Sequence, residues 1–166
     1  RIIKIYGANI TTALDPIEVC SGSGITLIAS SGVTGATFSW SPGSLSGSSI
    51  TVNPTTHTTY TVVASNANGC NTSSTLYVTV NPNPSVTFSP QVDLTCFGSN
   101  DGALTAVAAG GTSPYEYLWS NTETTALING LSVGNYICTV TDDNGCTGSN
   151  DADIVEPTAL TLSFTP

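Results

Sequence analysis

The stretches YTVVASNANGC, residues 60–70, and YICTVTDDNGC, residues 136–146, repeat one pattern 76 residues apart. Each opens on tyrosine, alternates apolar and polar side chains, and closes on Asn-Gly-Cys. Such alternation is typical of a half-buried β-strand, and Asn-Gly is typical of a tight turn between two strands. Because the pattern recurs at a fixed period, it predicts an array of similar β-modules.

The same 76-residue shift places Cys20 on Cys96 and brings Trp40 close to Trp119. It also matches YVTVNPNPSVTFSP, residues 77–90, with DIVEPTALTLSFTP, residues 153–166, and with residues 1–14. We therefore expect a segment of a longer array, with a leading strand or joint at 1–14, a first module at 15–82, a second module at 83–157 and a trailing strand at 158–166 that starts a further module. Two other interpretations stay open. One end is a strand donated to a neighbouring subunit, or residues 1–10 are the first strand of the first module.

The strand pattern predicts an all-β fold made of two tandem immunoglobulin-like β-sandwiches. Apolar residues at helical spacing are not sustained anywhere, and short alternating runs separated by Gly, Pro, Ser and Asn dominate. In the first module these runs are 25–29, 36–40, 50–52, 58–64 and 75–80. In the second they are 104–108, 115–119, 126–128, 135–141 and a weaker one near 153–155. Alternation assigns the core markers Trp40, Tyr60, Trp119 and Tyr136 to inner faces.

Cysteine spacing predicts one disulfide in each module. Cys20 and Cys70 are 50 residues apart, as are Cys96 and Cys146. Closing a loop of this size stabilises a domain by roughly 4 kcal/mol in the chain-entropy model, and disulfides indicate an oxidising compartment. The remaining cysteine, Cys138, stands where the first module has Val62. It is expected to be a small buried hydrophobe rather than a reactive thiol.

The charge balance excludes two classes of partner. The 166 residues hold two Lys and Arg against eleven Asp and Glu, a formal net charge of −9. A chain with so few cations does not bind nucleic acid or an anionic membrane surface. No run reaches the roughly 18 apolar residues of a membrane helix, so no membrane insertion is expected. With 39% hydrophobic residues, the chain should fold.

The second module contains three motif stretches: Cys-x-Gly-x-x-Asp-Gly, Gly-Gly-x-x-Pro-Tyr-x-Tyr-x-Trp-Ser, and Gly-Leu-x-x-Gly-x-Tyr-x-x-x-Val-x-Asp-x-x-Gly-Cys. They are met by Cys96, Gly98, Asp101, Gly102, Gly110, Gly111, Pro114, Tyr115, Tyr117, Trp119, Gly130, Leu131, Gly134, Tyr136, Val140, Asp142, Gly145 and Cys146. In these residues the second module resembles the SprB repeat of gliding Bacteroidota. Cys138 departs from the family, which has an aliphatic residue there. More loosely, VCSGSGITLIAS, FSWSPG and NPTTHTTYTVVASNANGC resemble the Ig-like or PKD-like modules of the same proteins.

Few residues suggest chemistry. His57 is the one histidine, and no nucleophile motif surrounds any serine. The paired carboxylates Asp142 with Asp143 and Asp151 with Asp153 are weak candidates for a glycosidase pair or for calcium. They are expected to be solvated turn residues instead. We expect no catalytic residue, no metal and no cofactor, with calcium as the open alternative.

The resemblance implies long, exported, repetitive cell-surface proteins that serve in adhesion, gliding or filaments, many of them exported by type IX secretion. The expected function is therefore a non-catalytic, extracellular structural or adhesive segment that acts as a stiff, disulfide-stapled spacer. The expected partners are neighbouring modules or identical subunits, with surface polysaccharide as a further candidate. The alternative function is a carbohydrate-binding accessory module of a secreted hydrolase.

Overall fold

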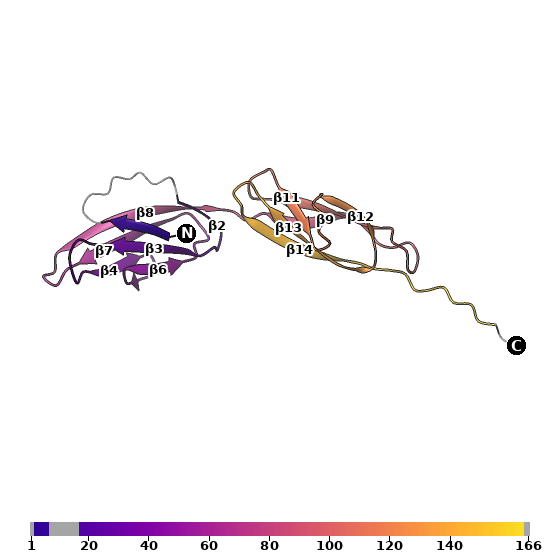
Figure 1. The fold of residues 1–166 in the computed structure, drawn as a ribbon, viewed down its shortest axis with the longest axis horizontal. Helices are drawn as coiled ribbons and strands as arrows, with labels where there is room; N and C mark the ends of the chain where they lie inside the picture. The colour runs from indigo at the N-terminus through magenta and orange to yellow at the C-terminus, as the bar shows by residue number, and fades with distance from the viewer. Residues whose placement is uncertain (1, 7–16, 165–166) are drawn as a thin grey trace. The chain divides into compact units, whose positions relative to one another are not determined.

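The computed structural model describes the backbone of residues 2–6 and the whole of residues 17–164. No helix occurs in these described residues, and the protein is all-β (Figure 1). The chain divides into two compact units, Arg1–Asn81 and Pro82–Pro166, called unit 1 and unit 2 below. Most of the predicted leading segment 1–14 lies outside the described residues; its described part, 2–6, is a strand.

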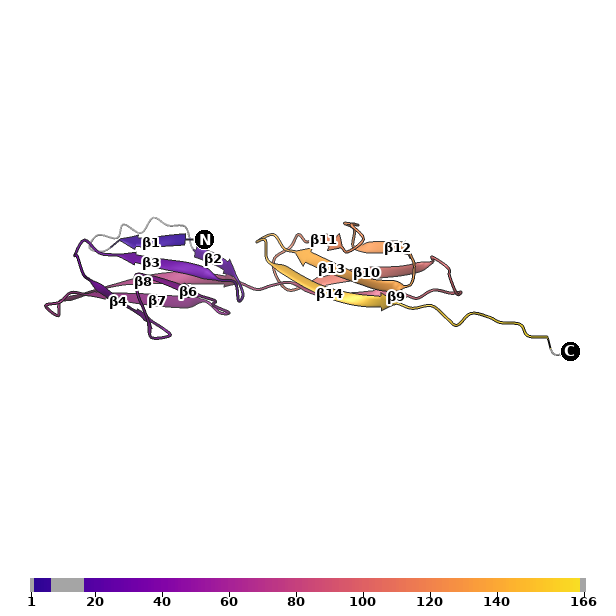
Figure 2. The same ribbon diagram turned by 60° about the horizontal axis from the view of Figure 1, so that its bottom comes forward.

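Unit 1 contains two sheets. The first has the order β1-β3-β6 and the second the order β2-β8-β7-β4-β5. β1 is parallel to β3, and both views place it beside that strand (Figures 1 and 2). β2 is parallel to the end of β8, whereas the other neighbours are antiparallel. The strands are β1 Ile2–Tyr6, β2 Ile17–Cys20, β3 Ile25–Ser30, β4 Thr37–Ser41, β5 Leu45–Ser46, β6 Ser49–Val52, β7 Thr58–Ser65 and β8 Asn71–Asn81.

The core of unit 1 lies between its two sheets. Period-two alternation sends every second side chain inward. One cluster therefore joins Leu27 of β3, Trp40 of β4 and Val78 of β8. The Trp40 indole is only 2% exposed and donates from Nε1 to the Gly47 carbonyl at 2.9 Å. That bond satisfies the one polar group that the ring brings into the core.

Unit 2 is a smaller pair of three-stranded sheets, with the orders β12-β10-β9 and β11-β13-β14. All of its strand pairs are antiparallel. Its strands are β9 Ser85–Val92, β10 Gly102–Ala109, β11 Glu116–Trp119, β12 Leu127–Leu131, β13 Gly134–Thr141 and β14 Thr147–Ile154.

The core of unit 2 repeats that of unit 1. Trp119 is 2% exposed, packs on Phe88 with ring centroids 5.6 Å apart, and donates from Nε1 to the Thr125 carbonyl at 2.8 Å. Tyr60 of unit 1 is buried, whereas Tyr136 of unit 2 packs against the core and donates its hydroxyl to the Ser132 carbonyl at 3.1 Å. The fully buried Cys138 thiol lies in the same cluster.

Two segments differ from the predicted strand runs. β14 begins at Thr147 rather than near 153, because it carries almost no apolar residues and pairs along its whole length with β13. The predicted trailing strand at 158–166 is not formed in its described part, since residues 155–164 carry no strand. The side chains of Leu160, Leu162 and Phe164 are 95%, 87% and 94% exposed. A strand needs a hydrogen-bonded neighbour, and β14 ends before this segment begins.

The two predicted disulfides are wrong. The thiols of Cys70 and Cys96 are free and exposed, so neither forms the expected bond with Cys20 or Cys146. Cys20 is the register partner of Asn81, the last residue of β8, whereas Cys70 comes immediately before Asn71, its first residue. At about 3.3 Å per residue, the length of β8 separates the two by far more than the roughly 7 Å between Cα atoms that a disulfide tolerates.

The second predicted pair fails for the same reason. Cys146 immediately precedes β14, which begins at Thr147. Cys96 follows Leu94, whose backbone N–H donates to the Val155 carbonyl just beyond the end of that strand. The equal 50-residue spacing therefore marks equivalent positions at opposite ends of each unit. Cys20 and Cys146 are both disulfide-bonded, but not to their predicted partners Cys70 and Cys96.

Candidate functional site

The Asn-Gly-Cys turns, residues 66–70 and 142–146, close equivalent hairpins in the two units. In unit 1, Ser65 pairs with Asn71 across the turn. The Asn66 side-chain oxygen accepts the backbone N–H groups of Asn68 and Cys70, each at 3.0 Å. Gly69 adopts a φ of 81°, which a residue with a side chain adopts only at a cost. This local geometry explains why Asn66 and Gly69 stand at these positions of the turn.

The turn of unit 2 is built in the same way around a carboxylate. Asp142 Oδ1 accepts the backbone N–H groups of Asn144 at 3.0 Å and Cys146 at 2.8 Å. Its other oxygen, Oδ2, accepts the N–H of Thr112 at 2.9 Å. Asp142 is only 5% exposed. Buried carboxylates require such donors, because a charge without hydrogen bonds is costly to desolvate.

The Gly-Gly-x-x-Pro-Tyr motif packs against this turn. A Cβ atom on Gly111 would lie 2.7 Å from Asp142 Oδ2, and the residue has a φ of +65°. Tyr115 donates its hydroxyl to the Gly110 carbonyl at 2.6 Å. The motif therefore serves as a structural clamp on the Asp142 turn.

The cysteines at the other end of each unit also lie in matching turns, which we call the Cys-x-Gly-Ser turns, residues 20–23 and 96–99. The N–H of Ser23 donates to the Cys20 carbonyl at 2.9 Å, and the N–H of Ser99 donates to the Cys96 carbonyl at 3.1 Å. The intervening glycines have φ values of 76° and 73°. Cys20 and Cys96 are thus structural equivalents.

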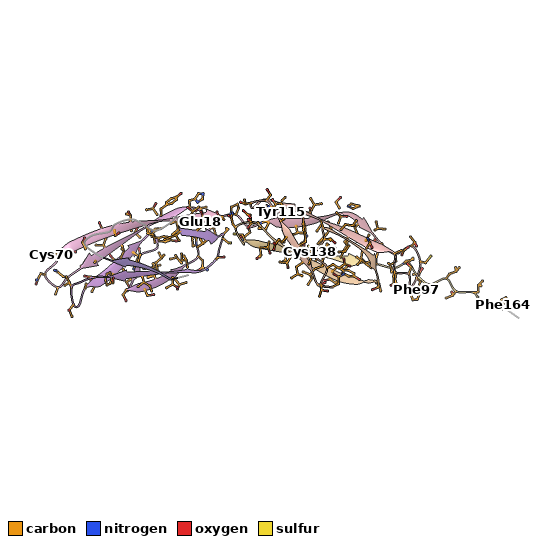
Figure 3. The ribbon with its side chains drawn as sticks, turned by 45° about the horizontal axis from the view of Figure 1, so that its top comes forward. Glu18, Cys70, Phe97, Tyr115, Cys138 and Phe164 are labelled. Atoms are coloured by element: carbon orange, nitrogen blue, oxygen red, sulfur yellow. The ribbon has the colours of Figure 1, made fainter. Side chains whose placement is uncertain are left out.

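A hydrogen bond joins the second Cys-x-Gly-Ser turn to Glu156, two residues beyond the end of β14. Glu156 Oε2 accepts the N–H of Gly98 at 2.9 Å. Asp101 accepts hydrogen bonds from the side chains of Ser99 and Thr95, and these bonds lower the pKa of its carboxyl to about 2. In Figure 3, Phe97 lies at the end of unit 2 from which the chain runs on to Phe164, while Tyr115 lies at the opposite end.

The described cysteines fall into three states. Cys20 and Cys146 are disulfide-bonded. Cys70 and Cys96 are free and exposed, and Figure 3 shows Cys70 at one tip of unit 1, opposite the end that carries Glu18. Cys138 is free but buried, and burial raises the pKa of its thiol to about 11. Only Cys70 and Cys96 are therefore placed for disulfide chemistry with another molecule or unit.

The candidate calcium ligands do not form one site. Asp142 is held by three backbone N–H groups, whose positive ends disfavour a cation. Asp151 and Asp153 both accept from the Asn135 side chain, at 2.8 and 2.9 Å, on the face of β14. Within the described residues, no three His, Cys, Asp or Glu side chains gather into a metal-binding group. Asp143 instead joins the turn through its backbone N–H, which donates to the Thr112 carbonyl at 2.9 Å.

His57 makes two contacts with β8. Its Nδ1 accepts the backbone N–H of Val80 at 3.0 Å, and its ring stacks on Tyr77 with centroids 6.2 Å apart. The imidazole thereby continues the hydrogen bonding of β8 beyond the point where β7 begins. Tyr77 is 55% exposed and forms with His57 the aromatic pair of this sheet surface.

Asp142 lies in a turn, as expected from the sequence, but the expectation that it is solvated is wrong, since it is only 5% exposed. The equivalent role of Asn66 was not predicted. The equivalence of Asn66 and Asp142 is visible in the aligned sequences, as the residue four positions before each Asn-Gly-Cys cysteine. An Asx side chain at that offset is a known turn-forming signal. By contrast, no sequence pattern predicted the bond from Gly98 to Glu156, because it depends on the register between a loop and the end of β14.

The structure, over the residues it describes, has no helix long and apolar enough to cross a membrane.

Comparison with family models identifies two modules. Residues 8–84 match the model described as Ig-like domain CHU_C associated, and residues 89–124 match the SprB repeat. Both are Bacteroidota-type surface modules, so the two resemblances drawn from the sequence are confirmed. The SprB match includes the Cys96 and Trp119 parts of the motif. It stops before Gly130–Cys146, where the resemblance stays a prediction.

Comparison with solved structures returns proteins of low sequence identity. An eight-domain N-terminal fragment of Down syndrome cell adhesion molecule has 14% identity and a TM-score of 0.47, covering 89% of this chain and 26% of that one. The insect immune protein hemolin has 13% identity and a TM-score of 0.44, covering 88% and 46%. A C-terminal fragment of intimin has 15% identity and a TM-score of 0.38, covering 70% and 50%. This chain thus spans about a quarter to a half of the length of each. The comparison with curated protein sequences returns no match.

Proposed function

We propose that this chain is a non-catalytic structural segment of an extracellular bacterial surface protein or filament, in which its β-sandwich units act as a stiff spacer. The SprB-repeat and CHU_C-associated matches support this proposal, because both families are Bacteroidota-type surface modules. The composition agrees with it. A surface with no Lys or Arg after Lys4 offers trypsin-like proteases no cleavage site.

The observation that carries the proposal is the short joint between the units. β8 of unit 1 ends at Asn81, and Pro84 is already buried in unit 2. A Cβ atom on Gly148 of β14 would lie 1.9 Å from the Pro84 carbonyl oxygen, so the joint rests directly on that strand. Only Pro82 and Asn83 stand between the end of β8 and this contact.

Such a joint has little conformational freedom. Proline fixes φ near −65° at two of its three positions, Pro82 and Pro84, and proline-rich connectors behave as semi-rigid spacers. A short, stiff connector passes a pulling or bending force from one folded unit to the next. Many modules in series would then hold an adhesive tip away from the cell surface.

The native thiols provide the test of stiffness. Spin labels on Cys70 and Cys96, in a Cys138→Val background, would report the distance between the units by pulsed electron resonance. We expect a narrow distance distribution for the native joint. The matched control replaces residues 82–84 with Gly-Ser-Gly and should broaden it. A native distribution as broad as that of the control would rule out the spacer function.

The surface assignment is tested in cells. We propose an extracellular location and export by type IX secretion, as the matched families suggest. Antibodies against the folded chain should label intact cells of the source bacterium, and deleting its type IX machinery should abolish the labelling. Labelling only of lysed wild-type cells would contradict the location.

The alternative, a carbohydrate-binding module, depends on exposed aromatic rings. Trp40 and Trp119 are buried and unavailable, whereas Tyr77, stacked on His57, is an exposed candidate on a sheet surface. Sugar platforms require an accessible aromatic face. Saturable binding to a surface polysaccharide that is lost in Tyr77→Ala and kept in the exposed-residue control Thr75→Ala would favour this alternative.

A further inference from the structure

We propose that Cys96 is one half of a disulfide that joins this chain to another β-sandwich unit, through that unit's Asn-Gly-Cys cysteine, and that Cys70 accepts the complementary bond from a unit on its other side. The inference deepens the proposed function and rests on it. It assigns a disulfide cross-link between neighbouring modules.

The repeat supplies the first argument. The protein has two kinds of cysteine turn, Cys-x-Gly-Ser and Asn-Gly-Cys, and each kind occurs once in each unit with the same backbone hydrogen bonds. The disulfide-bonded cysteines, Cys20 and Cys146, are one of each kind. The free and exposed cysteines, Cys96 and Cys70, are again one of each kind. Each free thiol is therefore the equivalent of a bonded one.

The chain that leaves beside each Cys-x-Gly-Ser turn supplies the second, independent argument. At the first turn, the N–H of Ser21 donates to the carbonyl of Asn81, after which the joint leads into β9. At the second turn, Gly98 bonds to Glu156, after which the trailing segment begins. The 76-residue shift places Leu162 and Phe164 on Val86 and Phe88 of β9.

These equivalent apolar residues have different surroundings. Val86 is buried and Phe88 packs on the core of unit 2, whereas Leu162 and Phe164 are 87% and 94% exposed. The trailing segment thus carries the side chains of a first strand without the sandwich that would bury them. It follows the turn whose thiol is free, so both features favour another β-sandwich unit as the partner.

The bond forms by exchange with a small-molecule disulfide such as oxidised glutathione. The Cys96 thiolate attacks one sulfur of that disulfide and releases one small thiolate. The Asn-Gly-Cys thiolate of the other unit then attacks the Cys96 sulfur and releases the second. Two protein thiols are oxidised to one disulfide, and one small disulfide is reduced to two thiols. Cys138 takes no part, because it is buried in the unit 2 core.

The test extends the full chain by one unit in the register of the repeat. Residue 166 corresponds to residue 90, so a second copy of residues 91–166 is appended after Pro166, with Cys96→Ser in the appended copy to keep the peptides distinct. The protein is oxidised with a glutathione redox buffer, alkylated and mapped by mass spectrometry without reduction. We expect a disulfide between Cys96 and the appended Asn-Gly-Cys cysteine, with loss of alkylation at Cys96.

The control changes the appended copy of Cys146 to serine, which should restore alkylation at Cys96. A Cys96 that stays fully alkylated although the appended unit melts cooperatively overturns the proposal. If the appended unit does not fold, a second arm decides with the chain as it is. Cys70→Ser and Cys96→Ser chains are mixed in the same buffer, and the Cys96–Cys70 heterodimer should be the main product. Homotypic dimers of either variant alone, or no dimer, overturn the proposal.

The two arms also separate the sources of the partner unit. Bonding in the extended chain alone indicates the next module of a longer polypeptide, and bonding in the mixture indicates a second copy. If both arms fail, the distance distribution between spin labels on Cys70 and Cys96 still tests the stiffness of the joint at residues 82–84. The spacer function is thus judged separately from this bond.

Discussion

At the scale of single residues, one side chain in each unit explains the repeated Asn-Gly-Cys turn. Asn66 and Asp142 hold their turns by accepting the backbone N–H groups two and four residues on. The side chain fixes the hairpin, and the hairpin fixes where the cysteine lies. Asp142 adds a third bond from Thr112, which ties the Gly-Gly motif to the turn.

Replacing Gly111 tests this clamp. We expect Gly111→Ala to lower the free energy of unfolding of unit 2 by about 3 kcal/mol, because it adds a Cβ beside the Asp142 carboxylate and forces a left-handed residue. Gly130→Ala is the matched control, since Gly130 has a φ of +70° and no atom within 4 Å of the added Cβ. It should cost about 1 kcal/mol. Equal losses in urea unfolding would contradict the clamp.

Asp101 gives the second turn a dependence on pH. Hydrogen bonds from Ser99 and Thr95 lower the pKa of its carboxyl to about 2. A lowered folded-state pKa stabilises the fold above the ordinary value for aspartate, and this contribution is lost as the pH falls through about 2. We expect the amide resonance of Thr95 to titrate in that range by NMR. Asp101→Asn should remove the titration, and a titration that persists in this variant would refute the assignment.

At the scale of strands, the alternating sequence pattern predicted the position of many strands. Runs such as 25–29, 58–64 and 135–141 lie within β3, β7 and β13, because their alternating apolar residues face a core. The polar strand β14 had no such signal over Thr147–Asp151 and is held by pairing with β13. Strand pairing, register and the opposite placement of the cysteines depend on long-range contacts that spacing along the chain does not report.

β14 also holds the joint, and Gly148 is its critical position. Gly148→Ala should push Pro84 away from β14, since the new Cβ would overlap the Pro84 carbonyl oxygen. We expect a loss of about 2 kcal/mol in the stability of unit 2 and a broader distance distribution between labels on Cys70 and Cys96. Ser149→Ala, at an exposed neighbouring position, should change neither. An unchanged distribution in Gly148→Ala would show that this contact does not stiffen the joint.

At the scale of the whole molecule, two folded units with separate cores are followed by an exposed apolar segment. Composition and motifs were sufficient to predict an all-β chain with SprB-like and Ig-like modules. They could not reveal which cysteines remain available, because that depends on the end of the sheet at which each turn lies.

Truncation separates the residues after β14 that stabilise unit 2 from those that do not. A chain ending at Pro157 should melt within about 1 °C of the full chain, because the residues removed make no strand. A chain ending at Ile154 also loses the Val155 carbonyl and the Glu156 carboxylate, the acceptors of Leu94 and Gly98. It should lose about 1–3 kcal/mol. Equal calorimetric melting of the two truncated chains would contradict this boundary.

The polar composition of β14 has a further consequence for crowded molecules. This strand is an edge of its sheet, and Asp151 and Asp153 place two carboxylates side by side along it. An exposed edge strand can pair with the edge strand of another molecule and start amyloid-like aggregation. Charged side chains along the edge disfavour this pairing. The acidic edge of β14 therefore keeps neighbouring molecules separate even at high local concentration.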